Sequence, residues 1–385
     1  MGVFIHWAGT AALLAQLAGA AVAWGADGGA DGVVAVGVEE FLGSTGDSAE
    51  QLLRLDLDRS GTLRAREDGV GGGWRLRGSS SAGRIDGALL DAQGAMVFNN
   101  HYADADLRDN VHAFADDVVT AITQGRGLAA SKLAFVGSRE GRRQIYVADS
   151  DGERIQQVTS DAALKGSPSL GPGGVLMAYT SWQSGFGDVV LKDLRDGRER
   201  TILSAPGTNS GAAFSLDGTR LALTMSYQGN AEIYMASVSG SRVRRLTHAR
   251  SVEFSPAWGP EGNRVVFCSD AGGGPQLYVV GRQGGAAERV ETGYRHNTSP
   301  EWSADGVHLA FTGRQGGGPA VVVHDLASGQ NRVLLARGEE PTWAPDGRHV
   351  AAVLDGALVV VDSVTGRRRT IVRGFSEIRE PSWSR

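Results

Sequence analysis

The sequence predicts a mainly β protein, a six-bladed β-propeller that follows a small α/β domain. Three observations lead to this fold class: a repeat of 40 to 44 residues, a high glycine content, and a stretch of about 100 residues before the repeat that lacks its period. Glycine supplies 56 of 385 residues and proline only 11, which favours many tight turns over collagen or a proline-rich linker. Residues that recur in every copy of a repeat usually have a structural role, even where they resemble catalytic residues. We therefore identify the repeat before interpreting single motifs.

The first segment, residues 1–26, is typical of a signal peptide. It contains no Asp, Glu, Lys or Arg, and an apolar run from Ala8 to Ala23 ends in two Ala-x-Ala sites, at Ala23 and Ala26. We therefore expect cleavage near Asp27 and export of the mature chain. The usual positive leader is missing, so a short buried helix or an uncleaved anchor remains an alternative.

A small α/β domain is expected over residues 27–128. Its amphipathic stretches follow helical spacing, and its β-branched runs follow strand spacing. Polar and glycine-rich triplets at 71–73 and 79–81 mark loops between them. The expected elements, in chain order, are a strand at 33–38, a helix at 47–57, weak strands at 74–77 and 95–99, and a helix at 104–123.

The propeller is expected over residues 131–385, where two aromatic or apolar series recur. One series is Leu170, Phe214, Trp258, Trp302, Trp343 and Trp383, and the other is Phe135, Tyr179, Leu223, Phe267, Phe311 and Ala352. Each copy starts after Ser-Pro or Glu-Pro and continues through an Asp-Gly turn into further apolar runs. Four short strands per copy, with no helical period between them, are typical of a propeller blade.

The first copy has only the second, third and fourth strands, whereas the end of the chain supplies only a first strand. We therefore expect the two ends of the propeller to share one blade and close the ring. Closure would remove the exposed sheet edges that an open stack carries.

Composition excludes several functions. Net charge is −5 from 38 basic and 43 acidic side chains, too little positive charge for a nucleic-acid partner. The single cysteine, Cys268, excludes an intrachain disulfide and a cysteine-built zinc site. No nucleophile elbow, zinc motif or phosphate loop is present, so we expect no catalytic residue, metal, cofactor or small-molecule substrate. Asp217, Asp305 and Asp346 recur in the same turn of successive copies, which indicates that they stabilise the turn. The tryptophans recur at one position of the repeat, which indicates that they belong to the core.

The arrangement resembles the TolB family, periplasmic propeller proteins of the Tol–Pal envelope system. The stretches that carry the resemblance are Asp56–Gly61, His112–Asp117 with Thr123–Gly127, the strand Lys132–Val136 and the Ser-Pro-x-Trp blades. The segment 68–91 is shorter than in the family, and residues 27–32 do not match the family's TolA-binding N-terminus.

The resemblance implies a non-enzymatic scaffold for protein–protein interaction that supports outer-membrane integrity and cell division. Its propeller mouth would bind a peptidoglycan-associated lipoprotein (Pal), and its N-terminal domain would communicate with the inner-membrane protein TolA.

Loops around the channel are the natural place for partner binding, because the sheets fix the ring while the connections vary. We expect the contact residues to differ from blade to blade and to combine charges with aromatic anchors. The candidates are Lys165, Trp182, Asn209, Tyr227, Glu253, Arg295, His296, Asn297, Glu339, Glu340, Arg379 and Glu380.

Two other functions remain open at this point. A secreted lyase or hydrolase would need titratable groups such as Lys165, His296 and Glu339 to converge on the axis. A carbohydrate-binding propeller would stack sugar on Trp182 or Tyr227.

Overall fold

The computed structural model describes residues 32–67, 73–103 and 106–384. The chain folds into two compact units, with the boundary between Thr123 and Gln124. The expected signal peptide, residues 1–26, lies outside the described residues. Within the part of the chain that is described, no helix is both long and apolar enough to cross a bilayer.

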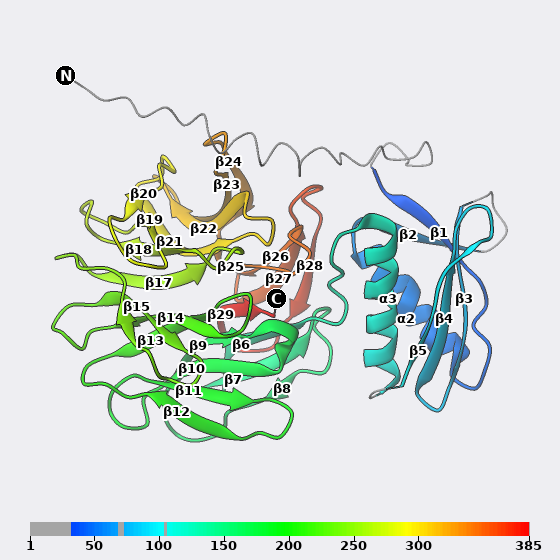
Figure 1. The fold of residues 1–385 in the computed structure, drawn as a ribbon, viewed down its shortest axis with the longest axis horizontal. Coiled ribbons are helices and arrows are strands. Elements are labelled where there is room, and N and C mark those ends of the chain that lie inside the picture. Colours follow the sequence, from blue (N-terminus) through cyan, green and yellow to red (C-terminus); the bar gives the residue numbers. More distant parts are fainter. Residues whose placement is uncertain (1–31, 68–72, 104–105, 385) are drawn as a thin grey trace. The chain divides into compact units, whose positions relative to one another are not determined.

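The N-terminal unit is a five-stranded sheet with two helices (Figure 1). Its sheet has the order β2-β1-β3-β4-β5. The helices pack on one face, where Leu53 and Leu57 of α2 and Phe114 of α3 are fully buried. The elements are β1 (Val34–Val38), α2 (Gly46–Arg59), β2 (Leu63–Glu67), β3 (Trp74–Ser81), β4 (Arg84–Leu90), β5 (Met96–Tyr102) and α3 (Leu107–Thr123).

Two expectations for this unit were wrong. The serines at 79–81 lie in the antiparallel pairing of β3 with β4, not in a loop. Strands β2 and β4 were not expected at all, because charged and small residues interrupt their apolar alternation. Tertiary pairing decides these segments, since strand preference depends on neighbours more than on the residue itself.

The second unit is a six-bladed β-propeller, as the repeat predicted (Figure 1). Blade 1 holds β9 (Lys165–Leu170), β10 (Leu176–Ser181), β11 (Asp188–Asp193) and β12 (Glu199–Leu203). Blade 2 holds β13 (Asn209–Phe214), β14 (Arg220–Met225), β15 (Glu232–Ser237) and β16 (Arg244–Arg245). Blade 3 holds β17 (Glu253–Trp258), β18 (Arg264–Ser269), β19 (Gln276–Gly281) and β20 (Glu288–Arg289).

Blade 4 holds β21 (His296–Trp302), β22 (His308–Arg314), β23 (Pro319–Asp325) and β24 (Asn331–Ala336). Blade 5 holds β25 (Gly338–Trp343), β26 (His349–Leu354), β27 (Ala357–Asp362) and β28 (Arg368–Val372). Blade 6 combines β29 (Glu377–Trp383) with β6 (Lys132–Arg139), β7 (Arg142–Asp149) and β8 (Gln156–Gln157). A short 3-10 helix, η1 (Pro172–Gly174), follows β9.

The ring closes through blade 6, where the last strand pairs antiparallel with the first strand of the propeller. Trp383 lies opposite Leu133. The indole Nε1 of Trp383 donates to Ser131 Oγ at 2.7 Å, and the backbone N–H of Lys132 donates to Ser384 Oγ at 2.9 Å. This pairing confirms the shared blade that the two partial repeats predicted.

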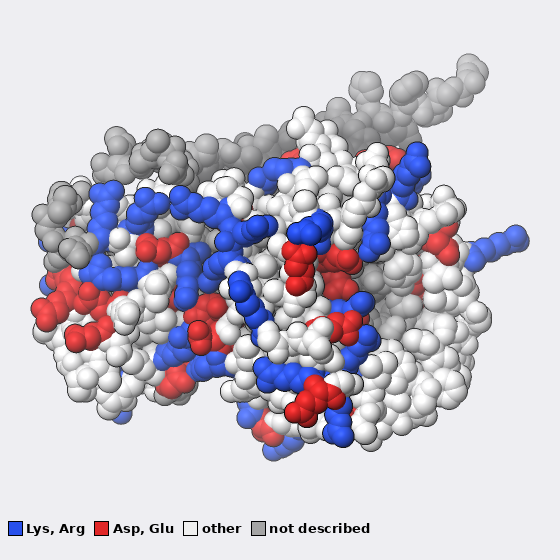
Figure 2. All heavy atoms as spheres, turned by 180° about the vertical axis from the view of Figure 1, so that it is seen from behind, with Lys and Arg blue, Asp and Glu red and all other residues white. Residues whose placement is uncertain are grey.

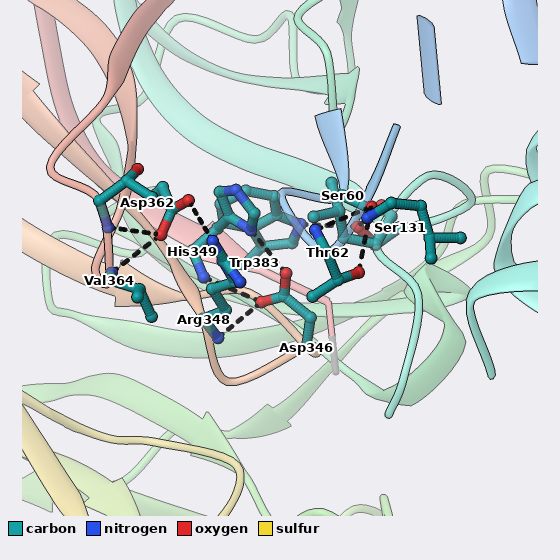
Figure 3. A network of polar contacts seen from close by, with 12 residues as sticks. Ser60, Thr62, Ser131, Asp346, Arg348, His349, Asp362, Val364 and Trp383 are labelled. Carbon is teal, nitrogen blue, oxygen red and sulfur yellow. Dashed lines mark hydrogen bonds and ion pairs between the residues drawn. The ribbon is translucent and has the colours of Figure 1, made fainter. Parts of the chain in front are cut away.

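The recurrent tryptophans and aspartates have structural roles. Trp258, Trp302, Trp343 and Trp383 are at most 2% exposed and lie in apolar clusters that pack adjacent blades together. In blade 5, Asp346 accepts hydrogen bonds from the backbone N–H groups of Arg348 and His349, both at 2.9 Å (Figure 3). Asp217 and Asp305 accept equivalent bonds in their own turns. The residues that recur at one position of every copy therefore stabilise turns, as the aspartates do, or fill the core, as the tryptophans do.

Candidate functional site

A cavity of about 310 Å³ lies on the axis of the propeller, and we call it the channel. The innermost strands of all six blades line it: β9, β13, β17, β21, β25 and β29. Among the described residues, its lining includes the carboxylates of Glu301, Glu340 and Glu380 and no basic side chain.

Each innermost strand carries the same β-bulge. In all six, pairing with the second strand shifts register at the residue before Pro or, in blade 2, before Ala. That residue has a left-handed φ between 49° and 61° in every blade, which is a glycine-like conformation that a bulge requires. The six residues are Ser167, Gly211, Ser255, Ser299, Glu340 and Glu380. The Ser-Pro and Glu-Pro motifs thus lie inside the strands and do not precede them.

A neighbouring blade satisfies the backbone N–H of several bulge residues. Gly211 donates to Thr180 Oγ1 of the preceding blade at 3.3 Å, and Glu340 donates to Thr312 Oγ1 at 2.8 Å. Cys268 holds the equivalent position of blade 3, and the backbone of Ser299 hydrogen-bonds to it. Thr224 of blade 2 is the exception, because its buried hydroxyl has no hydrogen-bond partner among the described residues.

Blades 5 and 6 have valines at this position, Val353 and Val136, and a valine cannot accept a hydrogen bond. In these two blades, glutamate carboxylates accept the hydrogen bonds instead. Glu340 Oε2 accepts from the backbone N–H of Glu380 at 2.6 Å, and Glu380 Oε2 accepts from that of Ser167 at 2.5 Å. Burial, and the neighbouring charge of Glu380, raise the pKa of Glu340. Blades 5 and 6 therefore carry Glu before Pro because the valines of their second strands cannot accept these hydrogen bonds.

One face of the ring carries the loops that precede each innermost strand and the loops between second and third strands; we call it the mouth face. Over blades 1 to 3 it exposes large apolar side chains: Leu164 (46%), Phe186 (60%), Tyr227 (53%) and Val252 (43%). Phe186 was not among the sequence candidates, although it is an aromatic residue in a glycine-containing loop outside the repeat. These four residues form the apolar arc.

Over blades 4 to 6 the mouth face is charged. Arg314 Nη2 lies 3.4 Å from Glu339 Oε2, and Arg143 Nε lies 2.8 Å from Glu377 Oε2. Arg379 also pairs with Glu377, and this hydrogen bond raises the pKa of the guanidinium. The residues of this charged arc are Arg143, Arg295, His296, Arg314, Glu339, Glu377 and Arg379.

Trp182 and Glu380 meet between the two arcs. Both lie over Gly166, where an added Cβ would stand 3.4 Å from the indole Cζ3 and 3.2 Å from Glu380 Oε2. The half-buried indole thus lies near the carboxylate of Glu380, above the start of β9.

Four sequence candidates are buried, which removes their side chains from any docking surface. Lys165 donates to Ser181 Oγ at 2.8 Å, and Asn209 donates to two backbone carbonyls. Asn297 donates to Gln276 Oε1 at 2.9 Å. The fourth is Glu253, 3% exposed. Each stands at or next to the start of an innermost strand, where Asn209, Glu253 and Asn297 contact residues of the preceding blade.

Glu253 forms a buried carboxyl pair with Glu232, which is held by Arg245 Nη2 at 2.5 Å and Thr247 Oγ1 at 2.6 Å. Burial and the charge of neighbouring Glu232 raise the pKa of Glu253 to about 7, and the hydrogen bond from Thr247 opposes this rise. The Oε2 atom of Glu253 has no partner among the described residues.

The three groups singled out for catalysis do not converge. Lys165 is buried in blade 1, where its Nζ also lies 2.8 Å from Asp161 Oδ2. His296 belongs to blade 4, on the opposite side of the six-membered ring, and Glu339 belongs to blade 5. In the described part of the chain, no three His, Cys, Asp or Glu side chains are grouped to hold a metal ion.

Comparison with known proteins places this architecture in a family. The family model "TolB beta propeller domain" matches residues 119–385. The chain is 33% identical over 213 residues to the Tol-Pal system protein TolB of Methylococcus capsulatus, covering 47% of this chain and 50% of that protein. It is 32% identical over 205 residues to the Tol-Pal system protein TolB of Albidiferax ferrireducens, covering 46% and 48%.

The chain spans half or less of the length of these curated relatives. A crystal structure of TolB from Acinetobacter baumannii has the same fold, with a TM-score of 0.76 and 24% identity, covering 91% of this chain and 96% of that one. The family model covers most of the chain, including every blade. This chain belongs to the TolB β-propeller family.

Proposed function

We propose that this protein is a non-enzymatic, periplasmic binding scaffold of a Tol–Pal system, and that its mouth face docks a Pal-like lipoprotein. The observation that carries the proposal is the division of one face into an apolar arc and a charged arc around the channel. Apolar side chains supply the buried anchors of an interface, whereas charges fix the orientation of the partner and its rate of approach.

Relatives named as Tol-Pal system proteins support the choice of partner. The alternative of a propeller enzyme loses support, because Lys165 and His296 lie on opposite sides of the ring. Communication with a TolA-like protein through the N-terminal unit, and a role in outer-membrane integrity and cell division, belong to the same proposal and rest on the family alone.

The test is binding of the purified chain to the periplasmic part of the Pal-like lipoprotein of the same organism, measured by calorimetry. Replacing Phe186 and Tyr227 together by alanine should weaken binding at least tenfold, because both rings are exposed anchors. The matched control is Val364→Ala. Val364 is 66% exposed but lies in a loop between third and fourth strands, on the opposite face.

A chain that does not bind the lipoprotein would remove the Pal assignment. Equal losses in the Phe186/Tyr227 variant and in the Val364 control would instead show that the mouth face is the wrong surface. Glu340 is unsuited to the test, because its carboxylate holds a backbone N–H group within the ring.

A further inference from the structure

The N-terminal sheet has one face on which neither of the two described helices, α2 and α3, packs. Alternation along the strands assigns residues to it: Gly78 and Gly87 point toward the helical side, where an added Cβ would strike Phe41 and Phe114. Their neighbours in sequence point the other way. On this open face stand Arg64, Arg66, Arg75, Arg77 and Arg84, all exposed.

The register of the strands arranges four of these arginines in two rows. Arg64 and Arg66 of β2 lie beside Ala35 and Gly37 of β1. On the other side of β1, Gly37 lies beside Arg75 of β3. Since neighbouring strands are about 4.8 Å apart, the two rows are about 10 Å apart. Between the two rows, β1 presents only the small residues Ala35 and Gly37, and we call this strip the trough.

Within the described part of the chain, no carboxylate of the fold neutralises these guanidinium groups. Among the residues that the structure describes, none of the five has a side-chain hydrogen bond or an ion pair with a carboxylate. Two carboxylates are near: Asp86, whose Oδ1 lies 2.6 Å from His101 Nδ1, and Glu39, which follows β1. In the view of Figure 2, basic side chains gather on this unit. Like charges that face each other across a sheet destabilise it, so folding alone does not account for the cluster.

We propose that this trough binds an extended acidic peptide segment of a partner protein. Guanidinium groups pair with carboxylates in a two-pronged geometry, which favours arginine over lysine at such sites. A chain in extended conformation is about as wide as one strand spacing, so it fits between rows about 10 Å apart. A planar anionic membrane would need no trough, and it is the less suitable partner. This surface is separate from the mouth face and does not depend on the Pal proposal.

The experiment measures fluorescence anisotropy of a labelled Glu-Ala decapeptide titrated with the purified full-length chain, and of a Lys-Ala decapeptide as the opposite-charge control. We expect binding of the acidic peptide only, weakened at least fivefold between 20 and 200 mM salt because surface charges are screened. Replacing Arg66 and Arg75 together by glutamate should reduce the affinity at least tenfold.

The matched control reverses two exposed propeller arginines, Arg242 and Arg250, and therefore changes net charge equally. It should leave binding within twofold of the original. The milder pair Arg66→Gln with Arg75→Gln guards against misfolding, and it should still lose at least threefold in affinity with unchanged thermal unfolding.

Three outcomes would overturn the proposal: no binding of the acidic peptide, an equal loss in the Arg242/Arg250 control, or retention by phosphatidylglycerol vesicles without binding of the peptide. The last result would identify the face as a membrane-contact surface.

Discussion

The carboxylate of Glu340 accepts a hydrogen bond from the backbone N–H of Glu380, with 2.6 Å between Oε2 and nitrogen, and so joins the innermost strands of blades 5 and 6. In blade 4 the hydroxyl of Thr312 performs this task for its neighbour. Val353, at the equivalent position of blade 5, offers no acceptor. The side chain within the channel thus compensates for an apolar residue on the second strand.

Replacing Glu340 by alanine should lower the free energy of unfolding by about 1–3 kcal/mol, because it leaves a buried N–H group without an acceptor. Adding Val353→Thr should restore part of this loss, since threonine places a hydroxyl where blades 1 and 4 have one. Urea denaturation of the two single variants and the double variant measures the coupling. Simple additivity of the two single effects would contradict the compensation.

The buried pair of Glu253 and Glu232 should make stability depend on pH. A carboxyl whose pKa is higher in the folded state stabilises the fold below its unfolded pKa, and this contribution is lost as pH rises through the folded value. For Glu253 the interval runs from 4.5 to about 7. We expect a loss of about 1–3 kcal/mol across it, because one pKa unit corresponds to about 1.4 kcal/mol and solvent screening reduces the effect.

Glu253→Gln should remove most of this pH dependence and make the protein more stable than the original at pH 8. Chemical denaturation at pH 5 and pH 8 measures the difference. The exposed Glu261 provides the control, since its replacement by glutamine should leave the pH profile unchanged. An identical profile in both variants would show that another group titrates.

Ring closure should depend on Trp383. Trp383→Ala removes a buried ring at the shared blade and should destabilise the propeller by about 3–5 kcal/mol. Trp383→Phe keeps an aromatic ring and loses the hydrogen bond to Ser131, so it should cost less. Thermal unfolding ranks the variants, and limited proteolysis should cut the C-terminal strand first in the alanine variant. A small effect of the alanine variant would mean that the closing strand contributes little.

The two arcs of the mouth face should respond differently to salt. Reversal of Glu339 to lysine should mainly slow association with the Pal-like lipoprotein, and the effect should shrink as salt screens the charges. The Phe186 and Tyr227 alanine variants should instead speed dissociation, largely independent of salt. Stopped-flow or surface-based kinetics at two salt concentrations separates these behaviours, and a salt-independent Glu339 effect would argue for a structural role.

Much of the fold could be predicted because the repeat is visible in the residues themselves. Tryptophans at one phase, Asp-Gly turns and a lone first strand at the end of the chain were enough to predict six blades and their closure. The strands β2 and β4 were not predicted, because their sequences, such as Leu63–Glu67, contain too few alternating apolar residues to stand out from a loop.

The site was predictable only in part. Sequence spacing placed the candidates near the ends of strands. It could not distinguish the four buried ones, Lys165, Asn209, Glu253 and Asn297, from Arg295 and Arg379, which remain exposed. It also missed the exposed ring of Phe186 and the arginine cluster on the N-terminal sheet.

The order of residues along the chain determined the number of blades, their turns and their cores, since these depend on a local periodicity that every copy repeats. The tertiary structure alone decided which polar side chains face solvent, and that Glu340 and Glu380 stand in for missing hydroxyl groups. Such relationships join residues of different blades, about 40 positions apart, and only the closed ring brings them within hydrogen-bonding distance.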